Sequence, residues 1–422
     1  MADYHFDYLF VGGGILGSSS AYALSKSLGR MGESASIAVV DIDLEGEHSS
    51  TLKNAGGVRA TWRNNANIQL CKYSINFYET IKDKLQFRQH GYKWLHNEAS
   101  WREMQGNLER YKEFGVNVEL YDPNKVTEHL PFVDNIEGVR GLSISGKSGL
   151  LDHYSLREYY RKEAKSRGVT FLDRIYINDV IVKDDKAEYL TGYDLSELIR
   201  SYGDTSDFTR AILESERHEF GANSISIEFN NFINTSGAWG PLISSLYGFE
   251  DKKIKPRKRQ IVIMNSQELD LINYGMIIDT SDIYFHQESQ NILAGYSNKD
   301  EPYGYNFDFT FGGMDENSMF VKYIWEPLWK RISRLERVKF IRGWAGIYAE
   351  TTDRSGYLGL VPGFQNIYEN IGHTGRGLMI SYGAGFALAD LILTGEFRDE
   401  LKYAIDLSRD RPSGQLYEEL HL

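Results

Sequence analysis

The sequence predicts an α/β protein in which a parallel sheet begins near the N-terminus and a strand-rich α+β domain is inserted into it. Three observations support this fold class. The first 41 residues contain an apolar run, a glycine-rich turn, a helix and a second apolar run; residues 246–340 contain several apolar runs of strand length; and another glycine-rich turn precedes a long apolar helix near the C-terminus. At 422 residues the chain is too long for one ordinary core, so we expect two domains.

The N-terminal pattern is that of a βαβ unit. Residues 8–11 form a short apolar run typical of a buried strand, and a glycine-rich turn follows at residues 12–17. Apolar residues then recur at helical spacing, which predicts a helix over residues 15–30. Residues 36–41 form a second buried strand, so we expect a parallel pair joined by a right-handed crossover.

The rest of the chain is predicted from the same periodicities. Helices are predicted over residues 64–88, 101–114, 155–167, 316–335 and 378–393, and strands over residues 92–95, 168–171, 229–235, 260–264, 282–286 and 291–295. Ser155 and Glu158 form a capping box at the start of one of these helices. Residues 183–222 are polar and have no clear period, so we interpret them as a surface insertion with short helices.

Composition narrows the class of protein. Hydrophobic residues make up 41% and charged residues 25% of the chain, which favours a globular protein over a disordered one. The net charge of −12 argues against nucleic acid as a partner, because phosphate binding requires a basic face. No signal segment and no apolar run of about 18 residues is apparent, so we expect no transmembrane segment and a cytoplasmic location. The single cysteine, Cys71, excludes an intrachain disulfide and a thiolate metal cluster, and we expect no metal.

The N-terminal glycine turn has the features of a dinucleotide site. Gly12 permits the tight turn, Gly14 lets a pyrophosphate approach bare backbone, and Gly17 lets the helix pack closely on the strand. The helix N-terminus offers free N–H groups and the positive end of its dipole to the phosphates. Asp41, at the end of the second strand, would accept hydrogen bonds from the adenosine ribose, which favours FAD or NAD over NADP. The turn alone does not separate FAD from NAD.

A second glycine-rich turn lies at residues 372–377. It opens a long apolar helix, so free backbone N–H groups and a positive dipole end are directed at one place. Reduced flavin carries negative charge near N1 and the C2 carbonyl. This helix end, with Arg376 or His373 nearby, would stabilise that charge.

Four blocks of the sequence together resemble the D-amino-acid oxidase superfamily of FAD-dependent oxidoreductases. The blocks are the first glycine turn with Asp41, TLKNAGGVR at residues 51–59, NTSGAW at residues 234–239 (similar to the family's AAGAW segment), and RGWAGIY at residues 342–348 followed by Thr352, Asp353, Gly359 and GHTGRGL at residues 372–378. They occur in the family order, in scattered blocks from residue 6 to about residue 395. The similarity is to the branch with sarcosine oxidases, glycine oxidases and dimethylglycine dehydrogenases.

The resemblance implies a Rossmann-like FAD-binding domain with a second, strand-rich substrate domain. Residues 1–88, 145–245 and 341–422 would form the FAD-binding domain, with the insertion near 183–222, and residues 89–144 and 246–340 the substrate domain. The residues expected to bind FAD are Gly12, Gly14, Ile15, Leu16, Gly17, Asp41, Ile42, Thr51, Asn54, Ala55, Gly56, Gly57, Ile177, Thr235, Ser236, Gly237, Trp239, Gly343, Gly346, Gly372, His373, Thr374, Gly375, Arg376, Gly377 and Leu378.

The FAD is expected to be noncovalent. Some relatives attach it through a cysteine two residues before the tyrosine of the fourth block, where this chain has Gly346. Others use a histidine just before the small-residue pair of the second block, where this chain has Asn54. His48 is close in sequence, but its register does not match.

The resemblance further implies hydride removal from the carbon next to a nitrogen of an amino acid or N-methyl amino acid, with transfer to flavin N5. Arg59 is the first candidate to bind the substrate carboxylate, Tyr348 to line the substrate cavity, and His286 to face the flavin. Arg63 and Lys258 are weaker candidates. Sarcosine oxidases have a carboxylate-binding lysine where this chain has Met379, which argues against sarcosine itself.

Two other interpretations remain open from the sequence. The same fold would serve a 2-hydroxy-acid or glycerol-3-phosphate dehydrogenase, which the basic run at residues 255–259 would favour, although such a run is more often a solvated strand edge. The chain would also fit an FAD-bearing subunit of an electron-transfer complex, with a partner subunit. The electron acceptor is left open among oxygen, a quinone and a carrier protein.

Overall fold

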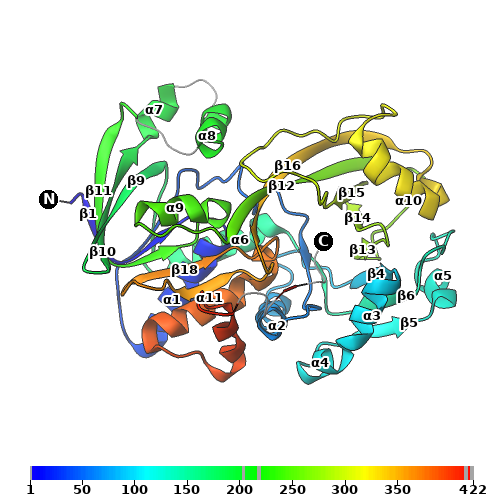
Figure 1. Ribbon diagram of the computed structural model, residues 1–422, viewed down its shortest axis with the longest axis horizontal. Helices are drawn as coiled ribbons and strands as arrows, with labels where there is room; N and C mark the ends of the chain where they lie inside the picture. The colour runs from blue at the N-terminus through cyan, green and yellow to red at the C-terminus, as the bar shows by residue number, and fades with distance from the viewer. Residues whose placement is uncertain (1, 202–204, 216–219, 413–416, 419–422) are drawn as a thin grey trace.

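The computed structural model describes residues 2–201, 205–215, 220–412 and 417–418, and these contain two eight-stranded sheets (Figure 1). The first sheet has the order β17-β18-β11-β1-β2-β8, with the pair β9 and β10 beside β11. Its strands are β1 (Tyr4–Val11), β2 (Ile37–Val40), β8 (Thr170–Leu172), β9 (Ile175–Lys183), β10 (Lys186–Asp194), β11 (Asn223–Asn234), β17 (Tyr357–Leu360) and β18 (Ile367–Ile371). The predicted α/β class, with a parallel sheet opened by a βαβ unit, is confirmed.

The second sheet is mostly antiparallel and has the order β16-β12-β15-β14-β13-β4-β6-β5. Its strands are β4 (Tyr92–His96), β5 (Glu119–Tyr121), β6 (Gly141–Ser145), β12 (Ile254–Asn265), β13 (Met276–Ile278), β14 (Ile283–Glu288), β15 (Asn291–Tyr296) and β16 (Lys339–Thr351). A short pair, β3 (Gly57–Val58) with β7 (Gly149–Leu150), lies outside both sheets. The predicted boundary at residue 341 falls inside β16, which pairs with β12 along its whole length.

The described residues contain eleven α-helices. They are α1 (Ile15–Met31), α2 (Asn65–Thr80), α3 (Glu98–Gly106), α4 (Leu108–Glu113), α5 (Val126–His129), α6 (His153–Lys165), α7 (Ser196–Ser201), α8 (Thr205–Leu213), α9 (Gly240–Leu246), α10 (Glu326–Arg331) and α11 (Gly377–Thr394). Helix α6 begins before the predicted capping box, because the Asp152 side chain accepts a hydrogen bond from the Ser155 amide (3.1 Å) and is the N-cap.

The pairing register of the parallel strands shows where the site lies. Val11 at the end of β1 pairs with Val40 of β2 and with Asn234 of β11, and all three strands run parallel. Their carboxyl ends therefore lie side by side, and the loops that follow them gather at one edge of the sheet. Ligands bind at this edge in open parallel sheets.

Helix α11 packs against α1 and α2 in the largest hydrophobic core. By length and composition alone it could span a membrane, with a mean hydropathy of 1.5, although no transmembrane segment was predicted from the sequence. Most of its residues are buried against other helices, and this burial accounts for its apolar character.

The 183–222 region, interpreted from the sequence as a surface insertion with short helices, contains two short helices and also a strand. Strands β9 and β10 form a hairpin that continues the first sheet antiparallel to β11, and α7 and α8 follow it. The strand alternation is broken by two register shifts, between Ala187 and Tyr189 and between Thr191 and Gly192. Such irregularities remove the period of two by which a strand is recognised in sequence.

Candidate active site

The largest cavity of the site, about 610 Å³, lies at the carboxyl ends of β1, β2 and β11. Its volume is in the range of about 300–1,000 Å³ that holds small ligands and cofactors. Most of the predicted cofactor residues line it: Gly12, Gly14, Ile15, Leu16, Asp41, Ile42, Thr51, Asn54, Ile177, Thr235, Ser236, Gly237, Trp239, Gly372, His373, Thr374, Gly375, Gly377 and Leu378.

Gly17 packs against the first glycine turn. A Cβ on Gly17 would lie 1.8 Å from the carbonyl oxygen of Gly12, so the start of α1 packs directly on the turn only because residue 17 has no side chain. Gly12 itself has φ +99° and lies against the backbone of Thr235 and Ser236. The spacing of the glycines therefore reflects contact between α1, β1 and β11.

Asp41 connects the glycine turn to the end of β2 by hydrogen bonds. Its carboxylate accepts hydrogen bonds from the amides of Gly13 (2.5 Å) and Asp43 (2.9 Å). Burial raises the pKa of this carboxyl to about 6, while the two amide donors oppose the shift. The group lines the cavity and is ionised at neutral pH, as a hydrogen-bond acceptor for ribose hydroxyls requires.

Two buried arginines of α6, which were not among the residues predicted from the sequence, also line this cavity. Arg161 donates to the carbonyl oxygens of Gly13 (2.6 Å) and Leu44 (2.7 Å), and Arg157 donates to that of Glu45 (2.8 Å). They hold the glycine turn and the loop after β2 in place. Their i, i+4 spacing on a predicted helix was the available signal, but it is also typical of a solvated face.

The insertion supplies one wall of the cavity. Ile212 and Leu213 of α8 line it, and the indole N–H of Trp239 donates to the Leu213 carbonyl (2.9 Å). The Glu214 carboxylate, just after α8, accepts a hydrogen bond from the Phe307 amide (2.8 Å). The end of α8 is thus bonded both to the turn after β11 and to the segment that contains Phe307, between β15 and α10.

The second glycine turn and the start of α11 also line this cavity. Gly375 has φ +80°, and a Cβ there would lie 2.6 Å from the Tyr348 ring, so this position requires glycine. His373 lines the cavity, but burial lowers its pKa to about 3, and its Nε2 lies 2.7 Å from Asn370 Oδ1. It is therefore neutral and does not supply the positive charge expected of it.

Arg376 differs from its prediction in position. Its guanidinium is fully buried, donates to the Arg354 carbonyl and lies 4.8 Å from the ring centre of Trp62, a wall of the smaller cavity, but Arg376 itself lines neither cavity. Three other predicted cofactor residues also line neither cavity. Gly17 packs on Gly12, Gly56 on the Leu151 carbonyl, and Gly343 on the Phe309 ring.

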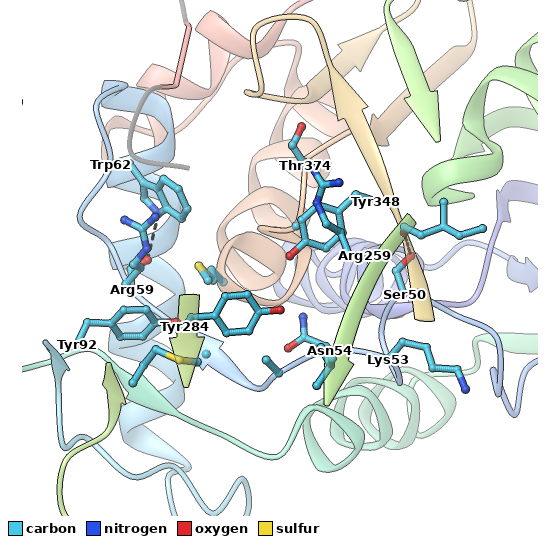
Figure 2. Close-up of a pocket in the computed structure, with 18 residues that line it drawn as sticks. Ser50, Lys53, Asn54, Arg59, Trp62, Tyr92, Arg259, Tyr284, Tyr348 and Thr374 are labelled. Atoms are coloured by element: carbon cyan, nitrogen blue, oxygen red, sulfur yellow. Dashed lines mark hydrogen bonds between the residues drawn. The ribbon is translucent and has the colours of Figure 1, made fainter. Parts of the chain in front are cut away.

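A smaller cavity of about 90 Å³ adjoins the first (Figure 2). The two share the lining residues Ser50, Asn54, Ile347, Tyr348, Thr374 and Gly375. The predicted cofactor residues Ala55, Gly57 and Gly346 line the smaller cavity as well. Small residues therefore surround the junction, where a flat ring system would fit against the backbone.

The rest of the smaller cavity is aromatic and positively charged. Trp62, Tyr92 and Tyr284 form apolar walls, and Arg59 and Arg259 bring cationic groups. Figure 2 shows the amino group of Lys53 directed away from the cavity. Its described lining residues include no aspartate or glutamate. Burial raises the pKa of Tyr92, Tyr284 and Tyr348, so their hydroxyls remain protonated at neutral pH.

Arg59, the first candidate for carboxylate binding, is placed on the smaller cavity. Its guanidinium lies 3.6 Å from the Trp62 ring centre and donates to the Thr61 carbonyl and, at 3.3 Å, to the Thr61 hydroxyl. The side chain is 2% exposed, and burial lowers its pKa from 12.5. Arginine keeps its charge under such a shift, so the site presents a fixed cation with a rigid orientation.

Tyr348 and Arg259 face this cavity from the neighbouring strands β16 and β12. Arg259 lies 5.3 Å from the Tyr348 ring centre and forms an ion pair with Glu350 (3.2 Å). Arg259 was predicted only as part of a basic run on a strand edge. Its burial depends on Glu350, which is far away in sequence, so the sequence carried no local signal for it.

His286 is not placed on either cavity. Its side chain is 1% exposed, and its ring nitrogens lie near the carbonyl oxygens of Ala55 (Nε2, 3.0 Å) and Gln287 (Nδ1, 2.8 Å). Burial lowers its pKa to about 4, so the ring is neutral. Its contacts support the backbone of the small-residue segment rather than a reacting group.

The other residues discussed from the sequence differ in whether they line a cavity. Met379 lines the smaller cavity, whereas Arg63 and Lys258 line neither cavity. Lys258 forms an ion pair with Glu301 (3.2 Å). The imidazole of His48 lies 3.1 Å from the Ser206 carbonyl and also outside both cavities.

Comparison with known proteins identifies the same fold and cofactor class. The family model described as FAD dependent oxidoreductase matches residues 7–391. The chain is 28% identical to FAD-dependent oxidoreductase domain-containing protein 1 of Xenopus laevis, covering 93% of this chain and 80% of that protein. It is 23% identical to sarcosine oxidase subunit beta of Rhizobium meliloti, covering 93% and 85%.

Two solved structures share the fold. L-proline dehydrogenase from P. horikoshii superposes with a TM-score of 0.76 at 22% identity, covering 96% of this chain and all of that one. Glycine oxidase from Geobacillus kaustophilus has a TM-score of 0.71 at 17% identity, covering 97% of this chain and all of that one.

Proposed function

Because this chain belongs to the FAD dependent oxidoreductase family, we propose that it oxidises the carbon–nitrogen bond of an amino acid or N-methyl amino acid. The observation that carries this proposal is the smaller cavity. It adjoins the dinucleotide cavity, is walled by aromatic rings and contains the buried cation Arg59, which suits a carboxylate-bearing substrate. The names of the similar proteins include sarcosine oxidase, glycine oxidase and proline dehydrogenase, which support an amino-acid substrate.

The residues of the larger cavity fit FAD. The N-termini of α1 and α11 both lie on it, and their free N–H groups suit the pyrophosphate and the flavin. Asp41 is available to the ribose, and the small residues at the junction leave room for a ring. When bound, FAD supplies a two-electron acceptor at N5.

We propose that this FAD is held noncovalently. Gly346 and Asn54, at the two family attachment positions, line the site without a thiol or an imidazole. The His48 ring is directed to Ser206 instead, and the cysteine Cys71 is buried outside both cavities. Denaturation followed by filtration tests this, and release of all the flavin from the protein is the expected result.

The protein's own residues would bind and orient the substrate. Arg59 would hold the carboxylate, and Tyr92, Tyr284 and Tyr348 would confine the carbon skeleton and donate hydrogen bonds. With cations and no acidic side chain in the described lining, the cavity disfavours an ammonium group and favours the neutral amine. A neutral amine can release a hydride from the adjacent carbon, and water then hydrolyses the imine to an amine and a carbonyl compound.

Anaerobic mixing with a panel of candidate substrates tests the proposal. The FAD-loaded protein is mixed with amino acids, N-methyl amino acids, 2-hydroxy acids and glycerol 3-phosphate, and loss of the oxidised flavin band is recorded. We expect bleaching by at least one amino acid or N-methyl amino acid and none by the matched hydroxy acids. Bleaching by hydroxy acids alone would overturn the proposal.

A second candidate function is 2-hydroxy-acid oxidation, because a lining with cations and no acidic side chain among the described residues also suits a carboxylate beside an uncharged hydroxyl group. The same panel separates the two. The name of the Rhizobium meliloti relative also supports a role as one subunit of a larger enzyme. Copurification of a partner protein with the chain would support that arrangement.

A further inference from the structure

The smaller cavity has two guanidinium groups that come from different parts of the fold. Arg59 follows β3, and Arg259 lies on β12 of the second sheet. Figure 2 shows Arg59 beside Trp62 and Arg259 beside Tyr348, with Tyr284 between them in this view. Arg59 is the cation to which the proposed function assigns a carboxylate, and Arg259 has no role in that scheme.

Arg259 is only partly neutralised. Glu350 Oε2 lies 3.2 Å from Arg259 Nη2 and 3.3 Å from Arg257 Nη1, so one carboxylate serves two guanidinium groups. The group of three has a net positive charge, although the side chains of Arg259 and Glu350 are each only 9% exposed. A buried excess charge is costly unless an anion completes it.

The hydrogen bonds of Arg259 also leave room for a ligand. Its Nη1 donates to the Lys258 carbonyl (3.1 Å) and its Nη2 to Glu350, while its Nε is buried and has no partner among the described residues. A single carboxylate at Arg59 would leave this second cationic region unused.

We propose that the substrate carries two anionic groups, one bound at Arg59 and the other at Arg259. This inference rests on the proposed function and narrows it to an amino acid with a second carboxylate, on its side chain or on its nitrogen substituent. The amine lies between the two arginines, against the tyrosine walls. Arg259 is then the residue that determines specificity, while Arg59 serves every carboxylated substrate.

Binding of inert acids tests the inference without any turnover. The FAD-loaded protein is titrated calorimetrically with succinate and glutarate, and with the monocarboxylates propionate and butyrate. We expect the dicarboxylates to bind about tenfold more tightly or better, since each charge-assisted contact contributes that much. In Arg259→Gln this advantage disappears while monocarboxylate binding is unchanged. Equal affinities in the unaltered protein would overturn the inference.

Two further variants control for folding. Arg257 keeps Glu350 paired in Arg259→Gln, so no buried carboxylate is left unpaired there. Arg259→Lys keeps the charge and should retain part of the dicarboxylate preference. Arg342→Gln removes the same charge from an exposed position on β16 and should leave all four affinities unchanged. An equal loss of dicarboxylate affinity in Arg342→Gln would contradict a local role for Arg259.

A substrate pair separates failure of this inference from failure of the proposed function. The anaerobic flavin band is followed with N-methylglycine and with N-methylaspartate. We expect the dicarboxylate to bleach it at least tenfold faster at low concentration. Equal rates would contradict the inference and leave amino-acid oxidation standing. Bleaching by neither compound, nor by any other amino acid, while dicarboxylates still bind at Arg259, would contradict the proposed function and support the two-anion site.

Discussion

The indole N–H of Trp239 donates to the carbonyl oxygen of Leu213 at 2.9 Å, which ties the segment after β10 to the end of β11. Both residues line the larger cavity of the site, so this bond fixes one of its walls. Leu213 comes from residues 183–222, in which the sequence showed no period, and it was not predicted to bind FAD. Trp239 lies outside that region and was predicted to bind FAD.

The first prediction concerns this bond. Trp239→Phe keeps an aromatic ring but removes the donor, and we expect FAD affinity to fall about two- to tenfold, as for one lost hydrogen bond. Trp325→Phe is a matched control, because the Trp325 indole donates to the Leu335 carbonyl (2.8 Å) away from the cavity. Fluorescence titration of the apoprotein with FAD measures both. An equal effect of the two variants would contradict a specific role for Trp239.

The second prediction concerns the glycine turn. Gly17→Ala would place a methyl group 1.8 Å from the Gly12 carbonyl, so we expect lost FAD binding and a free energy of unfolding lower by about 2 kcal/mol or more. Gly29→Ala, in the same helix, meets nothing within 4 Å and should raise the free energy of unfolding by about 0.5–1 kcal/mol. Urea unfolding with and without FAD gives both values. Normal FAD binding by Gly17→Ala would contradict the packing assigned to the turn.

The third prediction follows from the pKa of Asp41, which burial raises to about 6 in the free site. FAD hydroxyls donate to the ionised carboxylate, so binding favours the deprotonated form, and affinity should fall as pH decreases through about 6. Dissociation constants at about pH 5 and about pH 8 measure this effect. In Asp41→Asn the pH dependence over this interval should disappear. A constant affinity in the unaltered protein would contradict the assignment of Asp41 to the ribose.

The fourth prediction concerns Arg59. Arg59→Met should leave FAD content unchanged and lower kcat/KM for a carboxylated substrate about 10- to 100-fold, the contribution of a charge-assisted hydrogen-bonded pair. Arg59→Lys keeps the charge but lacks the planar guanidinium group, so its kcat/KM should lie between that of the unaltered protein and that of Arg59→Met. Steady-state kinetics with matched flavin loading is the measurement. An unchanged kcat/KM in Arg59→Met would remove Arg59 from the substrate site.

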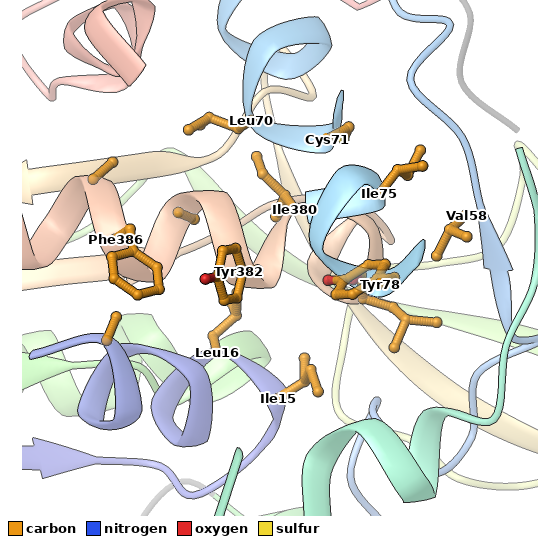
Figure 3. Packing of buried hydrophobic residues seen from close by; sticks show 14 of the residues in the cluster. Ile15, Leu16, Val58, Leu70, Cys71, Ile75, Tyr78, Ile380, Tyr382 and Phe386 are labelled. Carbon is orange, nitrogen blue, oxygen red and sulfur yellow. The ribbon is translucent and has the colours of Figure 1, made fainter. Parts of the chain in front are cut away.

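Much of the fold could be predicted because its signals are local. The glycine turns and the helices they open follow from steric requirements within a few residues, and α1 and α11 begin and end close to their predicted limits. Figure 3 shows why α11 is apolar: Ile380, Tyr382 and Phe386 lie among the labelled side chains of α1 and α2. Helix α11 is a core helix because α1 and α2 bury it, and this packing cannot be predicted from the local sequence.

The parts that could not be predicted depend on distant contacts. Arg259 is buried by Glu350, Arg161 is held by carbonyls of the loops after β1 and β2, and His286 is enclosed behind Ala55. In sequence these residues look like a solvated basic run, a charged helix face and a strand end. Their roles depend on which elements meet in space, and no periodicity encodes that.

Oxidation of a carbon–nitrogen bond can be detected by product analysis of a single anaerobic turnover. FAD-loaded protein is mixed with an amino acid or N-methyl amino acid that bleaches the flavin, and the released amine and carbonyl compound are quantified against the flavin reduced. We expect equal amounts of amine, carbonyl compound and reduced flavin. Flavin reduction without release of an amine would contradict it.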